Sequence, residues 1–319
     1  MITLKKTKII LDCDPGHDDA MALLMALAAE NIELLAVTTS AGNQRPEKTF
    51  QNAKKLLALA NREDIPVAMG AAKPIRRELI IAEEIHGESG LDGAHLPEPT
   101  VPALTISAND LLAKILKESD EKIVIVATGP LTNVAIFLLS HPELKEKIEL
   151  ISFMGGACFG GNMTPHAEFN IYVDPEAADV VVKAGVPTAM FGLDVTLKAQ
   201  LFPQDVQEIR EIANPVATTM ADLLDFFSLT TTVPFWAKPG HVEGIHMHDP
   251  CAMAYVIDPS IFEMYPMHVE VETGDLMSRG STVVDYDNVF GKEKNVAVSF
   301  GLDLAKFKDL VMKTMKFFS

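Results

Sequence analysis

Short apolar runs alternate with segments of helical periodicity along most of the chain. Strands are predicted at 8–14, 32–39, 65–70, 122–128, 148–156 and 187–192, and helices at 17–30, 46–62, 107–118, 129–139 and 175–185. Strands that are apolar almost throughout and are separated by helices are typical of a parallel sheet covered on both faces. Because such crossovers are right-handed, the pattern favours a doubly wound α/β sheet.

The C-terminal part has a different pattern. Helices are predicted to continue from 203 to 228, and the runs "MHVEVETG", "GSTVVDY" and "NVAVSF" then predict antiparallel strands, closed by a helix over 302–317. No repeat, low-complexity segment or charge-rich linker interrupts the chain. We therefore predict one domain, 1–319, with a mostly parallel sheet, helices on both faces and a small antiparallel C-terminal part.

Two long segments, 71–105 and 229–248, carry no clear prediction of a helix or strand. Loops of this length inside a compact domain are usually functional or disordered. Because ligands of open α/β sheets bind beyond the carboxyl ends of the strands, we expect both segments to cover that edge.

Composition narrows the possible partners. The chain has 319 residues, of which 48% are hydrophobic and 22% charged, as in ordinary globular proteins. A net charge of −17 argues against nucleic-acid binding, which needs clustered Lys and Arg. The start "MITLKKTKIILD" has no apolar core of a signal peptide. No apolar run approaches the ~20 residues that a membrane span needs. The three cysteines are widely separated, which argues against a disulfide framework. These features predict a cytoplasmic protein without a membrane segment.

The stretch "LDCDPGHDDAM" crowds four carboxylates, Asp12, Asp14, Asp18 and Asp19, between the first strand and the first helix. Like charges this close repel one another and raise one another's pKa. A helix N-terminus stabilises one anion by only ~0.3–1 kcal/mol, whereas a divalent cation could hold several. Oxygen ligands favour Ca²⁺ or Mg²⁺, although the spacing does not fit an EF-hand. The alternative is helix capping within a solvated acidic turn, which uses only one Asp.

A second candidate stretch is "HMHDPCAMAYVID", in which His246, His248 and Asp249 precede an apolar helix. A carboxylate and an imidazole at one helix end could supply a metal ligand and an acid or base. For Asp249 alone, simple helix capping is an equal alternative.

Polar residues also follow two predicted strands. Asn43 follows the second strand, and "FMGGACFGGNMTPHAEFNIYVD" contains Asn162, Glu168 and Asn170. In an extended chain Glu168 and Asn170 would project to the same side. With Asn162 they form an amide and carboxylate set suited to sugar hydroxyls, and ordinary polar loop structure is the alternative.

These motifs together resemble the inosine-uridine preferring nucleoside hydrolase family over essentially the whole chain. The matching stretches, in the family's order, are "ILDCDPGHDDAMAL", "VTTSAGNQ", "HGESGLDG", "ATGPLTNVA", "MGGACFGGNMTPHAEFNIYVDPEAA" and "HDPCAMAYVID". The resemblance implies hydrolysis of the N-glycosidic bond of ribonucleosides to ribose and free base, with a bound Ca²⁺. It also implies a ribonucleoside substrate, a role in nucleoside salvage and a homo-oligomer, dimer or tetramer.

The resemblance assigns the calcium ligands to Asp14, both carboxylate oxygens of Asp19, the backbone carbonyl of Thr128, and Asp249. Asp14 would also be the general base for a calcium-bound water, whose pKa the metal lowers. The acidic stretch would thus be a calcium site that also binds ribose.

The remaining assignments concern the substrate. Met154 would line the sugar site, His86 and His248 would lie near the leaving base, and His248 could act as its acid because an imidazole can change charge near neutral pH. The ribose hydroxyls would be held by Asp18, Asn43, Asn162, Glu168 and Asn170. Glu168 could also stabilise the positive charge of an oxocarbenium-like transition state.

The sequence departs from the family before the "HDP" motif, where it has "FFSLTTTVPFWAKPGHVEGIHM". Trp236 could stack on the base or merely pack the loop, and His246 could duplicate or replace His248. Purine or pyrimidine preference therefore stays open.

Two other functions remain to be tested. The first is a haloacid-dehalogenase-like phosphatase, because "LDCD" resembles its D-x-D motif, although Pro15-Gly16 follows where that chemistry needs a small residue and Thr. The second is a non-catalytic nucleoside- or sugar-binding protein on the same fold.

Overall fold

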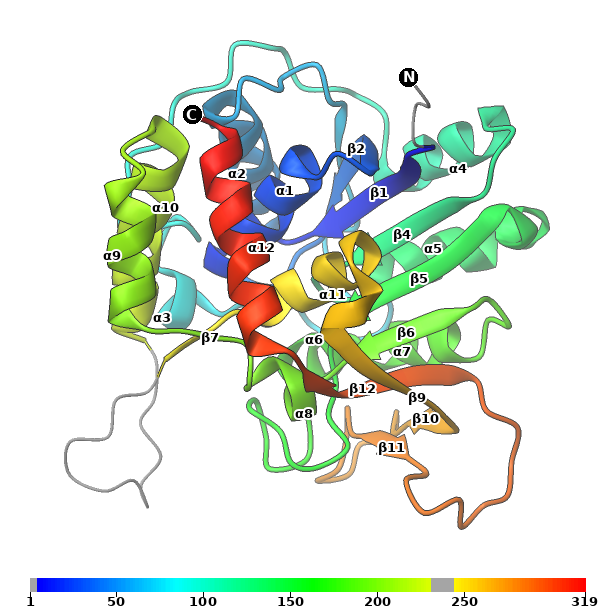
Figure 1. Cartoon of the computed structure of the whole chain (residues 1–319). Helices are drawn as coiled ribbons and strands as arrows, with labels where there is room; N and C mark the ends of the chain where they lie inside the picture. The colour runs from blue at the N-terminus through cyan, green and yellow to red at the C-terminus, as the bar shows by residue number, and fades with distance from the viewer. Residues whose placement is uncertain (1–4, 231–243) are drawn as a thin grey trace, which may run out of the picture.

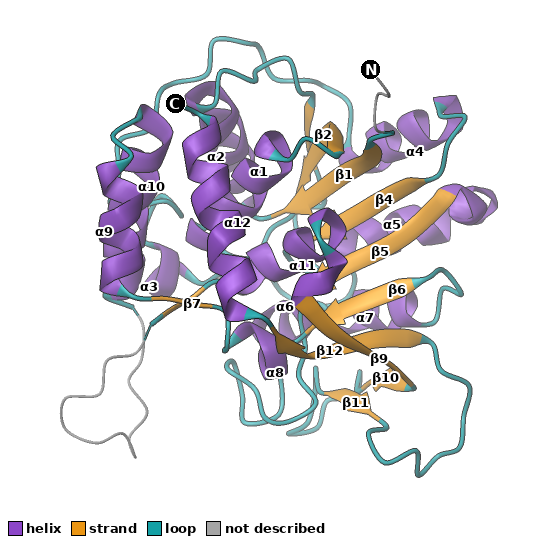
Figure 2. Cartoon of the chain, viewed as in Figure 1, coloured by secondary structure: helices purple, strands orange, loops and turns teal. Residues whose placement is uncertain are grey.

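An eight-stranded sheet forms the centre of the computed structural model, which describes residues 5–230 and 244–319 (Figures 1 and 2). All neighbouring strands are parallel except the last pair, β12 and β9. In spatial order the strands are β3 (Val67–Met69), β2 (Ile32–Thr39), β1 (Thr7–Cys13), β4 (Ile123–Ala127), β5 (Ile148–Met154), β6 (Thr188–Phe191), β12 (Val296–Leu302) and β9 (Phe262–Met267).

Helices cover both faces of this sheet (Figure 1). One buried apolar cluster joins the sheet to α1 (His17–Ala28), α2 (Pro46–Leu59), α9 (Pro203–Glu211), α10 (Pro215–Ser228), α11 (His248–Ile257) and α12 (Leu304–Phe317). A second cluster lies on the other face with α4 (Ala108–Glu118), α5 (Thr132–Ser140) and α7 (Pro175–Val182). The predicted doubly wound, mostly parallel α/β sheet is confirmed.

Helix α1 is unusual because every side chain from His17 to Leu27 is buried. The sequence explains this, since no polar residue follows Asp19 within the helix and both its sides can therefore pack against apolar neighbours. Its buried residues share one apolar cluster with those of α11 and α12. The N-terminus of α1, which carries Asp18 and Asp19, therefore lies inside the molecule rather than in solvent.

The C-terminal strands differ in part from the prediction. The small antiparallel pair is present as β10 (Val269–Val271) and β11 (Thr282–Val284). The run "NVAVSF", however, forms β12, which pairs parallel with β6 and antiparallel only with β9, a strand that was not predicted separately. An apolar run does not encode strand direction, which depends here on the free edge that β6 offers.

Several element boundaries also differ. The helical region predicted over 203–228 is two helices, because Ala213 adopts φ 59° and Asn214 caps α10 with its side chain. The long segment 71–105 contains a short helix, α3 (Glu83–His86). The other short elements are η1 (Pro142–Lys147), α6 (Phe169–Val173), α8 (Leu193–Thr196), β7 (Gln200–Leu201), β8 (Ile245–His246) and η2 (Pro259–Ile261). Within residues 5–230 and 244–319, no helix has the length and apolar composition that crossing a membrane requires.

Candidate active site

The strand order places the acidic stretch at a topological switch point. The chain leaves β1 toward β2 on one side, whereas β4 pairs with β1 on the other. In open α/β sheets such a point, at the carboxyl ends of the strands, is where ligands bind. Asp14 follows β1 and Thr128 follows β4, and the backbone N–H of Thr128 donates to the carbonyl of Asp12 at 2.9 Å.

A pocket of about 540 Å³ opens over this edge of the sheet. Its walls come from the strand ends, from α3, α6 and α8, and from the start of α11. It brings together predicted residues from across the chain: Asp18, Asn43, His86, Thr128, Met154, Asn162, Glu168, Asn170, His248 and Asp249. His246 also lines it. Trp236 lies outside the described residues.

Asp18 and Asp249 line the pocket, and Asp14 and Asp19 are buried beside them without lining it. Asp18, Asp19 and Asp249 each offer an oxygen within 4.8 Å of the other two. Asp19 is fully engaged: it accepts from the N–H of Gly16 at 3.0 Å, the amide of Asn43 at 2.9 Å and the hydroxyl of Thr128 at 2.7 Å. Helix capping, the alternative for this stretch, therefore explains one oxygen of Asp19 but none of Asp18 or Asp14.

Asp14 is satisfied at one oxygen only. Its Oδ2 accepts from the backbone N–H of Asn43 at 2.7 Å, whereas its Oδ1 is buried and has no hydrogen-bond partner among the described residues. A Cβ at Gly42 or Gly129 would collide with the Asp14 carboxylate, so only glycine lets the backbone come this close. A buried carboxylate oxygen without a donor is a place where a cation or a water fits.

Burial dominates the electrostatics of this cluster. It raises the pKa of Asp18 to about 7 and the pKa values of Asp14 and Asp249 well above the ordinary range, and neighbouring aspartates raise them further. No Lys or Arg belongs to the described residues that line the pocket. The donor set is oxygen only, including the backbone carbonyl of Thr128, so it fits a hard divalent cation.

Asp249 does not cap its helix, so that alternative is wrong. The N-cap of α11 is Met247, and Asp249 lies one residue inside the helix, where its backbone N–H reaches Asp18 Oδ2 at 3.4 Å. This position turns the Asp249 carboxylate toward the other aspartates.

Glu168 and Asn170 reach the pocket differently from the extended-chain prediction, which is wrong. The chain turns into α6 at Phe169, and Glu168 is its N-cap, accepting from the backbone N–H groups of Asn170 and Ile171. Gly156 N–H is a third donor at 2.9 Å, yet burial still raises the Glu168 pKa to about 7. Asn170 donates through Nδ2 to the Thr128 carbonyl at 2.8 Å.

Asn162 and Met154 lie on the rim and the wall of the pocket, respectively. The Asn162 side chain is exposed, and its Oδ1 accepts from the backbone N–H of Phe169 at 2.9 Å. Met154 ends β5, is 3% exposed, and its sulfur lies 3.4 Å from Asn170 Nδ2.

Two histidines line the pocket away from its acidic base. His248 Nδ1 lies 2.8 Å from the Thr196 hydroxyl, and burial, with a smaller contribution from His246, lowers its pKa to about 3. His86 lies on α3, where burial lowers its pKa well below the ordinary value. Its Nδ1 is 3.1 Å from His17 Nδ1, and its ring stacks on Phe227.

The sequence did not point to His17, Thr196 or Phe227 as parts of the site. His17 lies within the acidic stretch, so its position could have signalled a role. Thr196 and Phe227 carry no local signal, because only the packing of α8 and α10 brings them to the histidines.

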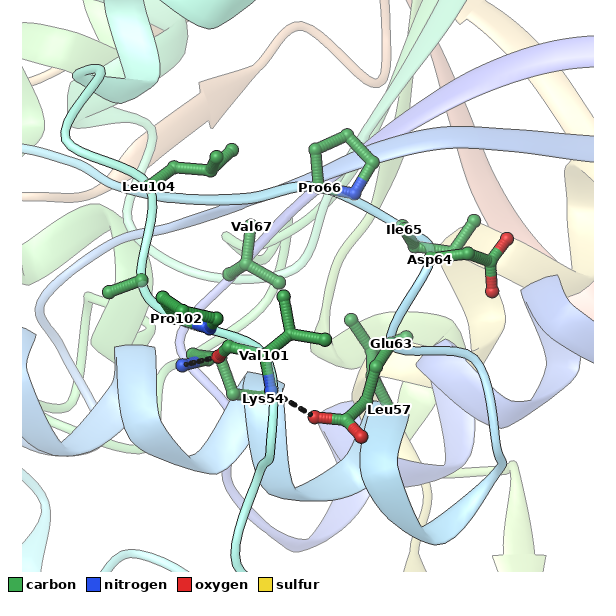
Figure 3. A pocket seen from close by; sticks show the side chains of 11 residues that line it. Lys54, Leu57, Glu63, Asp64, Ile65, Pro66, Val67, Val101, Pro102 and Leu104 are labelled. Atoms are coloured by element: carbon green, nitrogen blue, oxygen red, sulfur yellow. Dashed lines mark hydrogen bonds between the residues drawn. The ribbon is translucent and has the colours of Figure 1, made fainter.

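A second hollow of about 160 Å³ lies between α2, residues 63–67 and residues 101–104 (Figure 3). Its lining is mainly apolar, and its charged groups already have partners. Lys54 Nζ donates to the Val101 carbonyl at 2.7 Å, Glu63 accepts from Val101 N–H at 3.0 Å, and Asp64 accepts from the Arg62 guanidinium at 2.8 and 2.9 Å. It therefore offers no free group for chemistry.

The sequence profile of the inosine-uridine preferring nucleoside hydrolases matches residues 9–309 of the chain. The chain belongs to this family. It is therefore a nucleoside hydrolase, an enzyme that acts on ribonucleosides, as the motifs predicted.

Curated relatives of this nucleoside hydrolase are similar over nearly their whole length. It is 52% identical over 308 residues to the pyrimidine-specific ribonucleoside hydrolase RihA of Shewanella baltica, covering 97% of this chain and 96% of the relative. It is also 52% identical over 311 residues to the protein of the same name from Escherichia coli O8, covering 98% and 99%.

Solved structures of nucleoside hydrolases have the same fold. The purine-preferring ribonucleoside hydrolase from Gardnerella vaginalis aligns with a TM-score of 0.89 at 30% identity, covering 98% of this chain and 99% of that one. An inosine-guanosine nucleoside hydrolase aligns with a TM-score of 0.87 at 26% identity, covering 97% and 99%. Relatives of this nucleoside hydrolase thus carry names with different base preferences.

Proposed function

We propose that this nucleoside hydrolase cleaves pyrimidine ribonucleosides to ribose and free base, with Ca²⁺ and with Asp14 as general base. The observation that carries the proposal is the pocket itself: buried carboxylates at its base, amide and carboxylate groups on its wall and histidines lining the rest. The pyrimidine preference is supported by 52% identity to relatives named pyrimidine-specific, against 30% to a purine-preferring one.

The calcium would be held by Asp14, Asp19, the Thr128 carbonyl and Asp249. When bound, Ca²⁺ neutralises the aspartates and lowers the pKa of a water molecule. Asp14 Oδ1, the oxygen without a donor, takes the proton of the attacking water. The water oxygen then bonds to C1′ of the ribose.

The ribose is bound by Asp18, Asn43, Glu168 and Asn170, with Asn162 at the rim of the pocket. Carboxylates and amides of this kind can accept from and donate to the sugar hydroxyls. Glu168 has a further role, because its carboxylate can stabilise the positive charge that develops on the ring as the glycosidic bond breaks.

The leaving base is activated by hydrogen bonding. As the bond to C1′ breaks, its electron pair stays on the base, which becomes negatively charged. A His248 pKa of about 3 makes the ring neutral at pH 7, so His248 acts through its neutral N–H rather than through a change of charge near neutral pH. His86 lies in the same pocket and contacts the base from another side.

The phosphatase alternative is disfavoured by the charge of the pocket. A phosphate would enter among Asp18, Glu168 and Asp249 with no Lys or Arg among the described lining residues to balance it. A binding protein without catalysis would need no group to take a proton from water, a role for which Asp14 Oδ1 is free.

Release of reducing sugar across a panel of nucleosides tests the proposal. With Ca²⁺ present we expect kcat/KM for uridine and cytidine to exceed that for inosine and guanosine by at least about tenfold, or ~1.4 kcal/mol of discrimination. Phosphate release from UMP would instead indicate a phosphatase, and nucleoside binding without turnover would indicate a sensor. Higher kcat/KM for the purines would contradict the pyrimidine preference.

We also propose that the enzyme is a cytoplasmic homo-oligomer, a dimer or tetramer. Exposed aromatic side chains support association: Phe159 is 67% exposed, Tyr286 54% and Phe290 52%, and the Phe159 and Tyr286 rings are in contact. Light scattering that gives a monomer mass at micromolar concentration would contradict this proposal.

A further inference from the structure

We infer that Thr196 is a positioning residue that holds the His248 proton on Nε2, so that His248 presents an N–H to the leaving base. This inference rests on the proposed function and deepens it. Thr196 does not line the pocket, and the only side-chain hydrogen bond that it makes among the described residues is to His248.

Thr196 is the last residue of α8 and is fully buried. Its hydroxyl lies 2.8 Å from His248 Nδ1. Among the residues that the structure describes, His248 is the only hydrogen-bond partner of this hydroxyl. The pair therefore forms an isolated contact, with no other acceptor for the hydroxyl proton.

Because the Thr196 hydroxyl has no second acceptor among the described residues, the position of the proton on a neutral His248 ring is determined. If Nδ1 carried it, Nδ1 would donate to the Thr196 oxygen, and the hydroxyl proton would be buried without an acceptor, which is unfavourable. If Nε2 carries it, the hydroxyl donates to Nδ1 and both groups are satisfied. The Nε2–H form of His248 is therefore favoured, because it alone gives the Thr196 hydroxyl proton an acceptor.

The Nε2–H form suits the departure of the base. Nδ1 is occupied by Thr196, and His248 also lines the pocket, so Nε2 is the ring nitrogen left for the substrate. When the bond to C1′ breaks, the base takes the electron pair, and Nε2–H donates a hydrogen bond to the resulting anion. No full proton transfer from His248 is required, because the base can gain its proton from solvent.

The end of α8 orients both histidines of this wall. The residue after Thr196, Leu197, offers its backbone carbonyl to His246 Nδ1 at 3.1 Å. The His246 and His248 rings lie 5.7 Å apart between centroids. Helix α8 thus connects the carboxyl end of β6 to the base-binding part of the pocket.

The test compares Thr196→Val, which keeps the shape but removes the hydroxyl, with Thr196→Ser, which keeps the hydroxyl. Thr314→Val is the matched control, since it removes a buried hydroxyl that donates to a helical carbonyl at 2.9 Å, remote from the pocket. Each variant is assayed with uridine and with p-nitrophenyl riboside, whose leaving group needs no activation. Calcium is present throughout.

We expect Thr196→Val to lower kcat on uridine about tenfold or more while KM stays within about twofold, because only the departing base is affected. Turnover of p-nitrophenyl riboside should stay within about twofold, and Thr196→Ser should restore most of the uridine activity. Equal slowing of both substrates, or unchanged uridine turnover in Thr196→Val, would overturn the inference.

A spectroscopic measurement separates this inference from the proposed function. Long-range ¹H–¹⁵N correlation spectra of ¹⁵N-histidine-labelled enzyme, with His248 assigned by comparison with His248→Ala, report which ring nitrogen is protonated. We expect the Nε2–H form in the wild type. Protonation at Nδ1 would overturn the inference even if uridine is hydrolysed, whereas absence of hydrolysis in an enzyme with Nε2–H would overturn the proposed function.

Discussion

Asp14 and Asp19 both lie near the N-terminus of α1, but their carboxylates differ in the hydrogen bonds that they accept. Asp19 accepts hydrogen bonds at both oxygens, from Gly16, Asn43 and Thr128. Asp14 leaves Oδ1 without a donor, although the residue is 1% exposed. The free Oδ1 of Asp14 fits its proposed role of taking the water proton, whereas Asp19 is held by three donors.

Replacing Asp14 by Ala should abolish hydrolysis. We expect kcat/KM on uridine to fall by at least about 10³-fold, since both the base and a calcium ligand are lost. The fold should survive, because removal of Asp14 relieves like-charge repulsion in a buried site. Asp309→Ala, at an exposed position on α12, is the control and should behave as the wild type. Near-wild-type turnover by Asp14→Ala would rule out the mechanism.

Replacing His248 by Ala should slow the reaction in a way that depends on the leaving group. Uridine turnover should fall about 10²-fold or more, because one hydrogen-bond donor to the departing base is lost. p-Nitrophenyl riboside should be affected far less. His95→Ala, at an exposed histidine that does not line the pocket, serves as the control. If both substrates slowed equally, His248 would have no role at the base.

At the scale of elements, the junction between α6 and α7 keeps the site in place. Asp174 ends α6 and caps α7 through Ala177 N–H at 3.1 Å. The same carboxylate accepts from the Thr132 hydroxyl on α5 at 2.6 Å and from Ile75 N–H at 2.9 Å. One buried side chain thus joins two helices to the long segment that leads to His86.

Asp174→Ala should destabilise the protein more than the loss of an ordinary helix cap. We expect the free energy of unfolding to fall by about 2–3 kcal/mol, because a cap is lost and the Thr132 hydroxyl and Ile75 N–H lose their acceptor. Asp303→Ala is the matched control: Asp303 caps α12 at an exposed position, and its loss should cost about 1 kcal/mol. Urea denaturation of both variants measures the difference, and equal losses would refute the connecting role of Asp174.

At the scale of the whole molecule, buried acidic residues gather at the carboxyl ends of the sheet strands. Asp12, Asp18 and Glu168 each have a pKa of about 7, caused mainly by burial, and all lie at or beyond the carboxyl ends of the strands. Strands from both ends of the chain share this sheet, and the single domain stays a prediction. The position of these acids links the stability of the fold to pH and to the metal.

Without calcium, the protein should become less stable as the pH rises. Carboxyl groups with pKa values raised from about 4 in the unfolded chain to about 7 in the folded one bind more protons when folded, so stability falls between those pH values. A bound cation favours the charged forms and offsets this loss. Scanning calorimetry in EDTA should show a melting temperature several degrees lower at pH 8 than at pH 5.5.

Addition of Ca²⁺ should raise the melting temperature, and the increase should be larger at pH 8 than at pH 5.5, where protons compete with the metal. Asp14→Ala provides the matched comparison, since it should gain less from calcium than the wild type. An equal melting temperature with and without calcium at pH 8 would contradict the calcium site.

Local sequence determined most of the sheet and the family. The runs "KIILDCD" and "KIVIVAT" predict buried strands because their residues are apolar almost without interruption, which suits a sheet covered on both sides. The stretch "LDCDPGHDDAM" marks the site because its charges are adjacent in the chain, so their repulsion is evident without a structure. Motifs of this kind depend only on neighbouring residues.

Tertiary structure alone decided what depends on residues far apart in sequence. The direction of β12 follows from the edge offered by β6, and the turn at Phe169 places Glu168 as a helix cap instead of a strand residue. The contact of Thr196 with His248 spans 52 positions and has no signal in either segment. Such contacts arise only when the packing of helices on the sheet brings α8 against the start of α11, because hydrogen bonds require proximity in space and not along the chain.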